Sequence, residues 1–179
     1  MENQTQSRNI ILTYGLIYGA VIVVINLLIY VLGITLSTTG AIINIIALAF
    51  CIIALPILAI KKFKSQNNGF LIWGQALKIG VGVVALGAFI SILYTYFFTG
   101  IIEPNFYSEL NEFKTRKILE SSINDDQIKA ELALLASQAK TQGSIIGAAQ
   151  GLLFYVFLGF VVSAITGAVM KNTTEENQY

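Results

Sequence analysis

The chain has 179 residues, of which 55% are hydrophobic and 12% charged, and its formal net charge is +1. This balance provides no basic surface for nucleic acid, and we expect no nucleic-acid partner. The charged residues also avoid three long apolar segments, 9–60, 79–102 and 141–170. Segments of this length and composition are typical of helices that span a lipid bilayer in polytopic membrane proteins.

The first charge-free segment is too long for one helix, and turn-forming residues lie near its middle. Gly33 and the Ser-Thr-Thr-Gly run at 37–40 favour a turn there. We therefore predict two spans, at about 10–32 and 41–60, which cover roughly 30 to 35 Å at about 1.5 Å per residue. We expect the first span to be retained, because it is longer than the apolar part of a usual signal peptide.

Three lysines follow the second predicted span, at Lys61, Lys62 and Lys64. They predict a basic loop over 61–69. A third span is predicted at about 75–98, and the aromatic residues crowded at its far end are typical of a membrane interface. A fourth span is predicted at about 144–170.

Between the third and fourth spans the chain becomes polar, and we predict a helical hairpin over 103–143. Asn124 precedes two aspartates and is a good helix N-cap. Apolar residues recur there at helical spacing in two stripes, Phe106, Leu110 and Phe113, then Ile128, Leu132, Leu135 and Ala139. The predicted fold is therefore all-α: a single membrane domain over 1–179, with four transmembrane helices and an extramembrane helical hairpin between helices three and four.

The lysines also predict an orientation. Lys61, Lys62 and Lys64 flank the second span directly, and Arg8 and Lys171 flank the first and fourth. By the positive-inside rule, both termini are expected in the cytoplasm of a multi-pass inner (plasma) membrane protein.

Catalytic and metal-binding residues are scarce in this sequence. It contains no histidine and one cysteine, Cys51, and no Asp or Glu falls within a predicted span. A histidine-ligated zinc site, a Ser-His pair and a carboxylate-coupled transporter each need residues that are missing. We therefore expect no enzyme activity, no metal and no cofactor.

Small residues recur at four-residue spacing along the fourth span, and this is the clearest positive pattern. The set includes Gly147, Gly151, Gly159, Ser163 and Gly167. Four-residue spacing keeps them near one helix face, where another helix can approach closely. The partner is either a helix of the same bundle or another molecule. A homo-oligomer or a protein partner can use this face or the 103–143 hairpin, and the lipid bilayer surrounds the rest.

Three amide side chains lie inside predicted spans, at Asn26, Asn44 and Gln150. With the predicted topology, all three fall within roughly 10 Å of the outer membrane boundary. Because an unpaired amide in hydrocarbon is costly, we expect at least two of them to meet or to share a polar pocket. Such a cluster is either a structural clasp or the mouth of a small binding cavity.

Three segments carry a family resemblance: 14–17 (Tyr-Gly-Leu-Ile), 69–80 at the entry to the third span, and 102–107 after it. With these motifs the chain resembles a family of small bacterial four-helix integral membrane proteins, the domain of unknown function family four-one-nine-nine. The resemblance covers nearly the whole chain, although Glu103 stands where an aspartate is expected. It implies a membrane location and a fold, without an activity.

Two functions fit these features. The leading prediction is a non-enzymatic scaffold or accessory subunit. The alternative is a small transporter or lipid-handling membrane protein. A polar cavity that reaches the middle of the membrane favours the alternative, whereas a sealed, dry bundle favours the scaffold.

The predicted orientation can be tested with single cysteines at Ser108 and Ser121 on a Cys51→Ala background. Both positions lie in the hairpin that we predict to be extracytoplasmic. They are expected to react with a membrane-impermeant thiol reagent in intact cells. Labelling that appears only after lysis would reverse the topology.

Overall fold

The structure is a computed structural model that describes residues 2–121 and 124–172. The described chain is helical throughout, apart from turns and one isolated β-bridge. Its helices are α1 (Glu2–Val31), α2 (Thr38–Gln66), α3 (Trp73–Phe97), a π-helical turn (Phe98–Ile102), α4 (Phe106–Leu119), α5 (Asp125–Ala139) and α6 (Ile145–Met170). The predicted all-α fold class is confirmed.

Four of these helices are long and apolar enough to cross a membrane. The candidate spans are Thr5–Val31, Thr38–Gln66, Trp73–Ile102 and Ile145–Met170. Their outward faces expose large apolar side chains, with Ile45 of α2 65% and Phe157 of α6 60% exposed. Continuous apolar surface of this extent is unfavourable in water and suits contact with lipid.

The predicted basic loop over 61–69 is wrong in its first part, because α2 continues to Gln66. Lysine and glutamine are good helix formers, and lysine side chains can extend towards the headgroups, so the helix does not end where the apolar run ends. The turn follows it: Asn68 and Gly69 have φ values of 52° and 85°.

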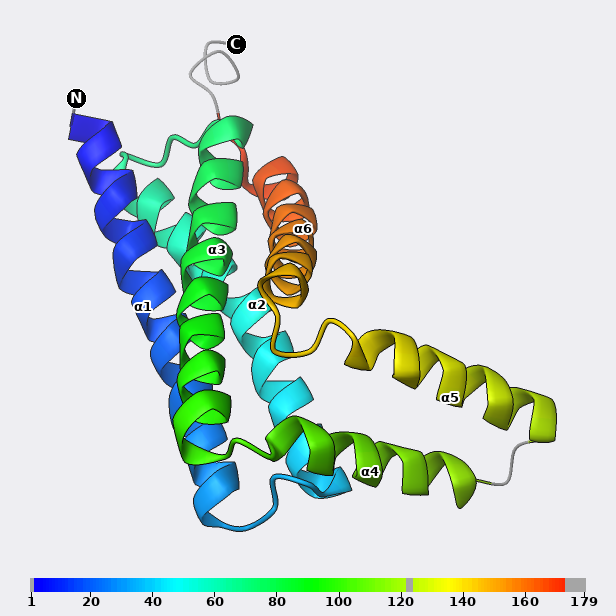
Figure 1. The fold of residues 1–179 in the computed structure, drawn as a ribbon. Coiled ribbons are helices and arrows are strands. Elements are labelled where there is room, and N and C mark those ends of the chain that lie inside the picture. The colour runs from blue at the N-terminus through cyan, green and yellow to red at the C-terminus, as the bar shows by residue number, and fades with distance from the viewer. Residues whose placement is uncertain (1, 122–123, 173–179) are drawn as a thin grey trace.

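The first residue of α1 and the last residue of α6 lie at the same end of the bundle (Figure 1). We call this the termini end, and the opposite end, beside α4 and α5, the arm end. At the termini end Leu71 and Asn172 form the β-bridge, with N···O distances of 3.1 and 3.0 Å. Lys64 Nζ donates to the carbonyl of Met170 at 2.9 Å. These bonds fix the end of α6 to the last turn of α2 and to the α2–α3 connection.

The helices α4 and α5 lie side by side and project from the bundle (Figure 1). Asn124 caps α5 as predicted, and its side chain accepts a hydrogen bond from the Gln127 N–H. Leu135 is buried and the other members of the two predicted apolar stripes are half-buried, so the stripes are partly covered where α4 and α5 lie against each other. Residues 122 and 123, where the break between the helices is predicted, lie outside the described residues.

Close helix packing also forms a seam between α3 and the second half of α6. A Cβ atom added at Gly159 would lie 2.8 Å from Val84 Cβ, and one at Gly167 would lie 2.8 Å from Ala76 Cβ. From the other side, a Cβ at Gly80 would collide with Ser163. The two backbones therefore approach closely because these positions carry no larger side chains.

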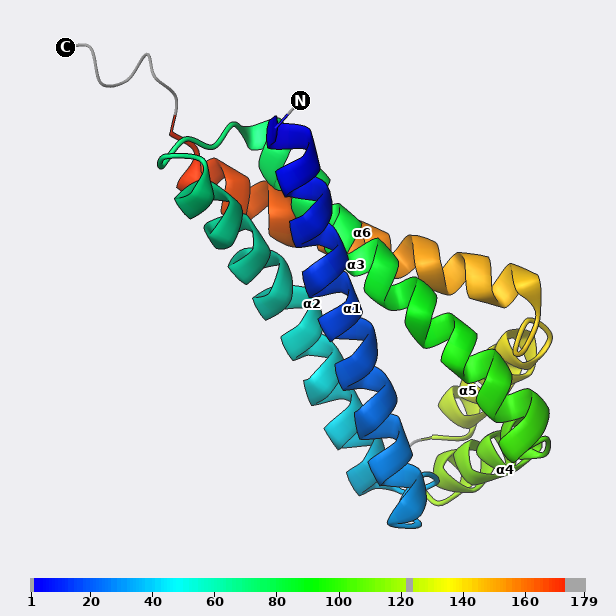
Figure 2. The same ribbon diagram turned by 90° about the vertical axis from the view of Figure 1, so that its left-hand side faces the viewer.

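The first half of α6 is different, because it contains no buried residue before Gly159. Figure 2 shows α6 leaving α2 towards the arm end. No heavy atom outside its own helix turn lies within 4 Å of a Cβ added at Gly151. At Gly147, an added Cβ would meet the Thr141 carbonyl just before α6, not another span. The predicted small-residue face is therefore packed in its second half only.

Replacing Gly159 with Leu is expected to lower the stability of the folded protein by about 1–3 kcal/mol, because the side chain would have to displace Val84. Gly151→Leu on the same helix face is the matched control and is expected to change stability little. Thermal unfolding in detergent measures both. Equal stability of the two variants would show that the α3–α6 seam tolerates a bulky residue.

Candidate functional site

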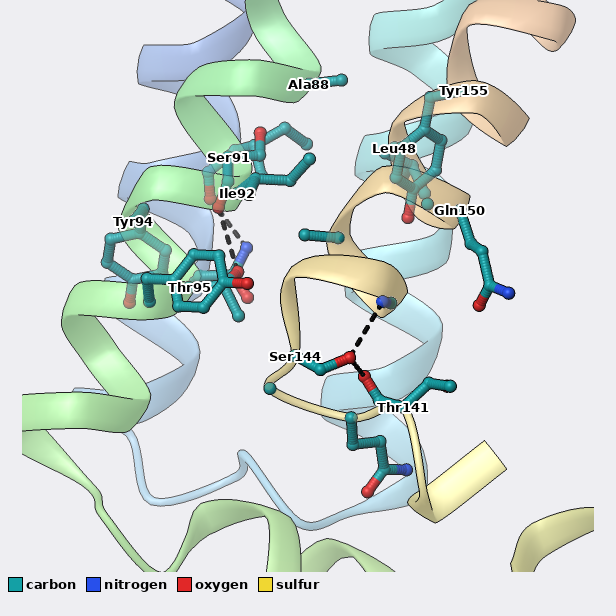
Figure 3. A pocket seen from close by; sticks show the side chains of 18 of the residues that line it. Leu48, Ala88, Ser91, Ile92, Tyr94, Thr95, Thr141, Ser144, Gln150 and Tyr155 are labelled. Carbon is teal, nitrogen blue, oxygen red and sulfur yellow. Dashed lines mark hydrogen bonds between the residues drawn. The ribbon is translucent and has the colours of Figure 1, made fainter. Parts of the chain in front are cut away.

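A cavity of about 460 Å³ lies between the four spans in the arm-end half of the bundle (Figure 3). Its lining combines amides, hydroxyls and tyrosines with apolar residues, and most of the exposed lining surface is apolar. The polar members are Asn26, Asn44, Gln138, Gln142, Gln150, Ser91, Thr95, Thr141, Ser144, Tyr18, Tyr94, Tyr96, Tyr107 and Tyr155. None of the described lining residues carries a charged side chain.

The cavity extends from the surface to the middle of the spans. Exposed residues such as Gln138 and Gly143 form its rim, and Tyr18 and Ala88 form a fully buried floor. Tyr18 lies midway along the span Thr5–Val31. A volume of this size lies within the range of small-molecule sites.

The amides of α1 and α2 meet in the wall of this cavity. Asn44 Nδ2 donates to Asn26 Oδ1 at 2.8 Å, and Asn26 Nδ2 donates to the Ile22 carbonyl at 2.8 Å. Gln150 of α6 lines the same cavity but is exposed, and its carboxamide points away from Ser91 and Thr95 of α3 (Figure 3). The structure therefore joins two of the three predicted amides and places the third across the cavity.

The α5–α6 connection forms the rim. Ser144 caps α6: its Oγ accepts from the Gly147 N–H at 3.0 Å and donates to the Thr141 carbonyl at 2.6 Å (Figure 3). Gly143 has a φ of 69°, which suits glycine.

The helix α4 holds this connection in place. Asn111 of α4 and Gln142 exchange two amide hydrogen bonds, at 2.9 and 3.2 Å. The ring of Tyr107 packs against Gly143, where a Cβ would lie 3.0 Å from it. Burial raises the pKa of Tyr107, although hydrogen bonds with Thr99 and Gly143 act in the opposite direction. Its hydroxyl therefore stays neutral at physiological pH.

A group of aromatic rings fixes α1 and α3 together at the arm end. Phe98 contacts Tyr30, Tyr94 and Phe106, with ring centroids 5.2, 5.8 and 5.5 Å apart. The Tyr30 hydroxyl also donates to Glu103 Oε1 at 3.1 Å. Because Tyr94 lines the cavity, this cluster supports one of its walls.

Tyr18 was not singled out by the sequence analysis, although it is the most deeply placed polar residue of the cavity. Its ring packs on Gly87 of α3, where any Cβ would collide with it. Its hydroxyl is buried and has no hydrogen-bond partner among the described residues. The available signal was its spacing, because Tyr18 precedes Asn26 by two steps of four residues and shares its helix face.

The described residues contain no group of three or more His, Cys, Asp or Glu side chains that would suit a metal ion. The described lining of the cavity presents neutral hydrogen-bonding groups beside its apolar surface. Amides and hydroxyls both donate and accept hydrogen bonds, so their arrangement is suited to holding a polar, uncharged molecule.

The family described as "Protein of unknown function (DUF4199)" matches residues 13–172 of this sequence. The chain belongs to this family. The resemblance carried by the motifs at 14–17, 69–80 and 102–107 is thereby confirmed. No curated protein and no solved structure matches the chain. The family description gives no activity.

The amide pair is expected to contribute measurable stability. In a double-mutant cycle with Asn26→Leu and Asn44→Leu, the coupling energy should be about 0.6 to 2 kcal/mol, the range for hydrogen bonds between membrane helices. Unfolding in detergent measures it. Gln150→Leu, which removes an exposed amide outside this pair, is the control and is expected to leave stability nearly unchanged. A coupling energy near zero would mean that the pair does not clasp α1 to α2.

Proposed function

We propose that this protein is a multi-pass protein of the inner (plasma) membrane whose cavity binds a small uncharged ligand. This is the role of a small transporter or lipid-handling protein. The observation that carries the proposal is the cavity itself, because its polar lining continues from the arm-end surface to Tyr18 at the middle of the span. A binding site near the midplane between spans is the usual arrangement in membrane transporters.

The cavity favours this role over the scaffold role that the sequence also allowed. A scaffold needs only a packed bundle, and unfilled volume between helices lowers stability because the surrounding atoms lose packing contacts. Polar groups within the bilayer are also costly unless they are paired. This bundle has an unfilled volume and polar side chains at the same place. Ligand binding explains why both occur together.

A binding role also suits the chemistry of the lining better than catalysis. Its described residues are amides, hydroxyls and tyrosines, with neither histidine nor carboxylate among them. General acid–base catalysis near neutral pH draws mainly on those two missing groups. We therefore propose a non-enzymatic protein.

The cations beside the spans at the termini end support the proposed orientation, whereas the five cations of the α4–α5 arm (103–140) are outnumbered there by seven acids. Arg8, Lys61, Lys62, Lys64, Lys78 and Lys171 all lie near the termini end of their helices. Placing that end in the cytoplasm follows the positive-inside rule and turns the cavity rim to the opposite face of the membrane. The ligand would then enter from the extracytoplasmic side or from the outer leaflet.

Filling the cavity is expected to remove the ligand. Gly151→Phe would place a ring in the cavity, since Gly151 lines it and has free space at its Cβ position. Native mass spectrometry of protein released from cell membranes in polymer nanodiscs should show a bound small molecule on the natural protein. Its occupancy should fall several-fold in the variant.

The matched control is Gly74→Phe, at an exposed glycine of α3 that also has free space and lies at the termini end. This variant should retain the bound molecule. If the natural protein carries no molecule, or if both variants keep it equally, the cavity is not a ligand site and the scaffold role replaces this proposal.

A further inference from the structure

We infer that the cavity recognises an uncharged polyhydroxylated group, a sugar, with Asn44 and Tyr18 as the contacts that determine specificity. The sugar is either a free saccharide or the head of a neutral glycolipid. This inference rests on the proposed function, because it names the ligand chemistry of the same cavity.

The absence of charged side chains in the described lining restricts the charge of the ligand. A charged ligand would lose its hydration in the cavity without gaining an opposite charge, and this desolvation is expensive at low dielectric. Glu103 and Glu109, the acids on either side of Tyr107 in the chain, are not among the lining residues, and Glu103 accepts a hydrogen bond from Tyr30. An uncharged ligand avoids this penalty.

The hydroxyls of α3 present hydrogen-bond acceptors to the cavity. Ser91 Oγ donates its single hydrogen to the Gly87 carbonyl at 2.9 Å, and Thr95 Oγ1 donates to the Ser91 carbonyl at 2.9 Å. Each oxygen keeps its lone pairs for another donor. Thr141 Oγ1 at the rim is engaged in the same way, since it donates to the Gln138 carbonyl at 3.1 Å. A ligand that matches these positions must supply donors.

The amide pair continues this pattern. The bond between Asn44 and Asn26 uses Asn44 Nδ2 and Asn26 Oδ1, so Asn44 Oδ1 keeps its acceptor capacity. Each Nδ2 atom also has a second hydrogen. Gln138, Gln150 and the tyrosine hydroxyls add further donors to the lining. An array that offers both acceptors and donors fits several hydroxyl groups.

Tyrosine rings complete the match. Tyr94 and Tyr155 contribute to the lining from α3 and α6, on opposite sides of the cavity (Figure 3). Sugar rings have apolar C–H faces that pack on aromatic rings, while their hydroxyls project from the edges to hydrogen-bonding groups. Tyrosine suits both contacts, because it has an apolar ring and a polar hydroxyl.

The unpaired hydroxyl of Tyr18 sets the length of the ligand. Asn26 and Tyr18 are eight residues apart on one face of α1, which corresponds to about 12 Å. Two linked sugar rings cover about this distance. A disaccharide held by the amide pair would extend to the Tyr18 side chain at the cavity floor, where a small rotation of that side chain would bring its covered hydroxyl to a sugar hydroxyl and give it the hydrogen bond that it lacks.

The first test measures thermal unfolding of the full chain in lipid nanodiscs prepared without sugar-based detergent. The probes are maltose, octyl maltoside below its micelle concentration, octanol, maltobionate as an anionic disaccharide, and octyltrimethylammonium as a cation. Maltose or octyl maltoside should raise the melting temperature, and the other three should not. A shift with maltose indicates a saccharide site, and a shift with octyl maltoside alone indicates a glycolipid site.

The second test uses Tyr18→Phe. Without ligand this variant should be as stable as the natural protein or more stable, because it loses only an unpaired hydroxyl. Its affinity for the active maltose probe should fall about tenfold, the loss of one good hydrogen bond. Tyr14→Phe, one helical turn away and outside the cavity lining, should leave affinity unchanged.

Several results would overturn the inference. It fails if neither maltose probe shifts the melting temperature, or if octanol or a charged probe shifts it as much. It also fails if Tyr18→Phe lowers the stability of the free protein and leaves affinity unchanged, since Tyr18 would then have only a structural role. The proposed function is tested separately: a bound mass that Gly151→Phe removes would support a ligand site even if no sugar binds.

Discussion

The architecture depends on how closely α3 and α6 approach at the termini end. Gly159 and Gly167 of α6 leave room for Val84 and Ala76 of α3, and Ser163 fits against Gly80. Lys64 and the Leu71–Asn172 bridge fix the same end of α6. A helix held tightly at one end and crossing its neighbours obliquely must separate from them at the other. The cavity is therefore a consequence of the seam, with no special element needed to create it.

The separation of α6 also explains the insertion between the third and fourth spans. The α5–α6 connection lies over the cavity rim, and α4 fixes it through the Asn111–Gln142 amide pair and the contact of Tyr107 with Gly143. The aromatic cluster around Phe98 fixes the start of α4 to α1 and α3. The α4–α5 pair is thus a support for the rim.

The sequence predicted the class of the fold well, because charge-free segments follow directly from the cost of placing ions in hydrocarbon. It also predicted the N-cap at Asn124. It misplaced the end of α2, since lysine permits helix to continue beyond the apolar core. Regular spacing identified the small residues of α6. It could not distinguish Gly159, which packs against Val84 of α3, from Gly151, which has no neighbouring side chain at its Cβ position. That difference depends on the angle of α6, which no local pattern encodes.

The site was only partly predictable for a similar reason. Amides inside apolar runs are conspicuous, so Asn26 and Asn44 were found, and their bond joins α1 to α2. Tyrosine is common in membrane helices and attracts no attention by itself. The importance of Tyr18 arises from its neighbours: Gly87 lets its ring cross to α3, and no described residue accepts or donates at its hydroxyl. An unsatisfied buried hydroxyl costs about 1–3 kcal/mol, so a glycine that brings it to a cavity floor is explained better by a ligand than by stability.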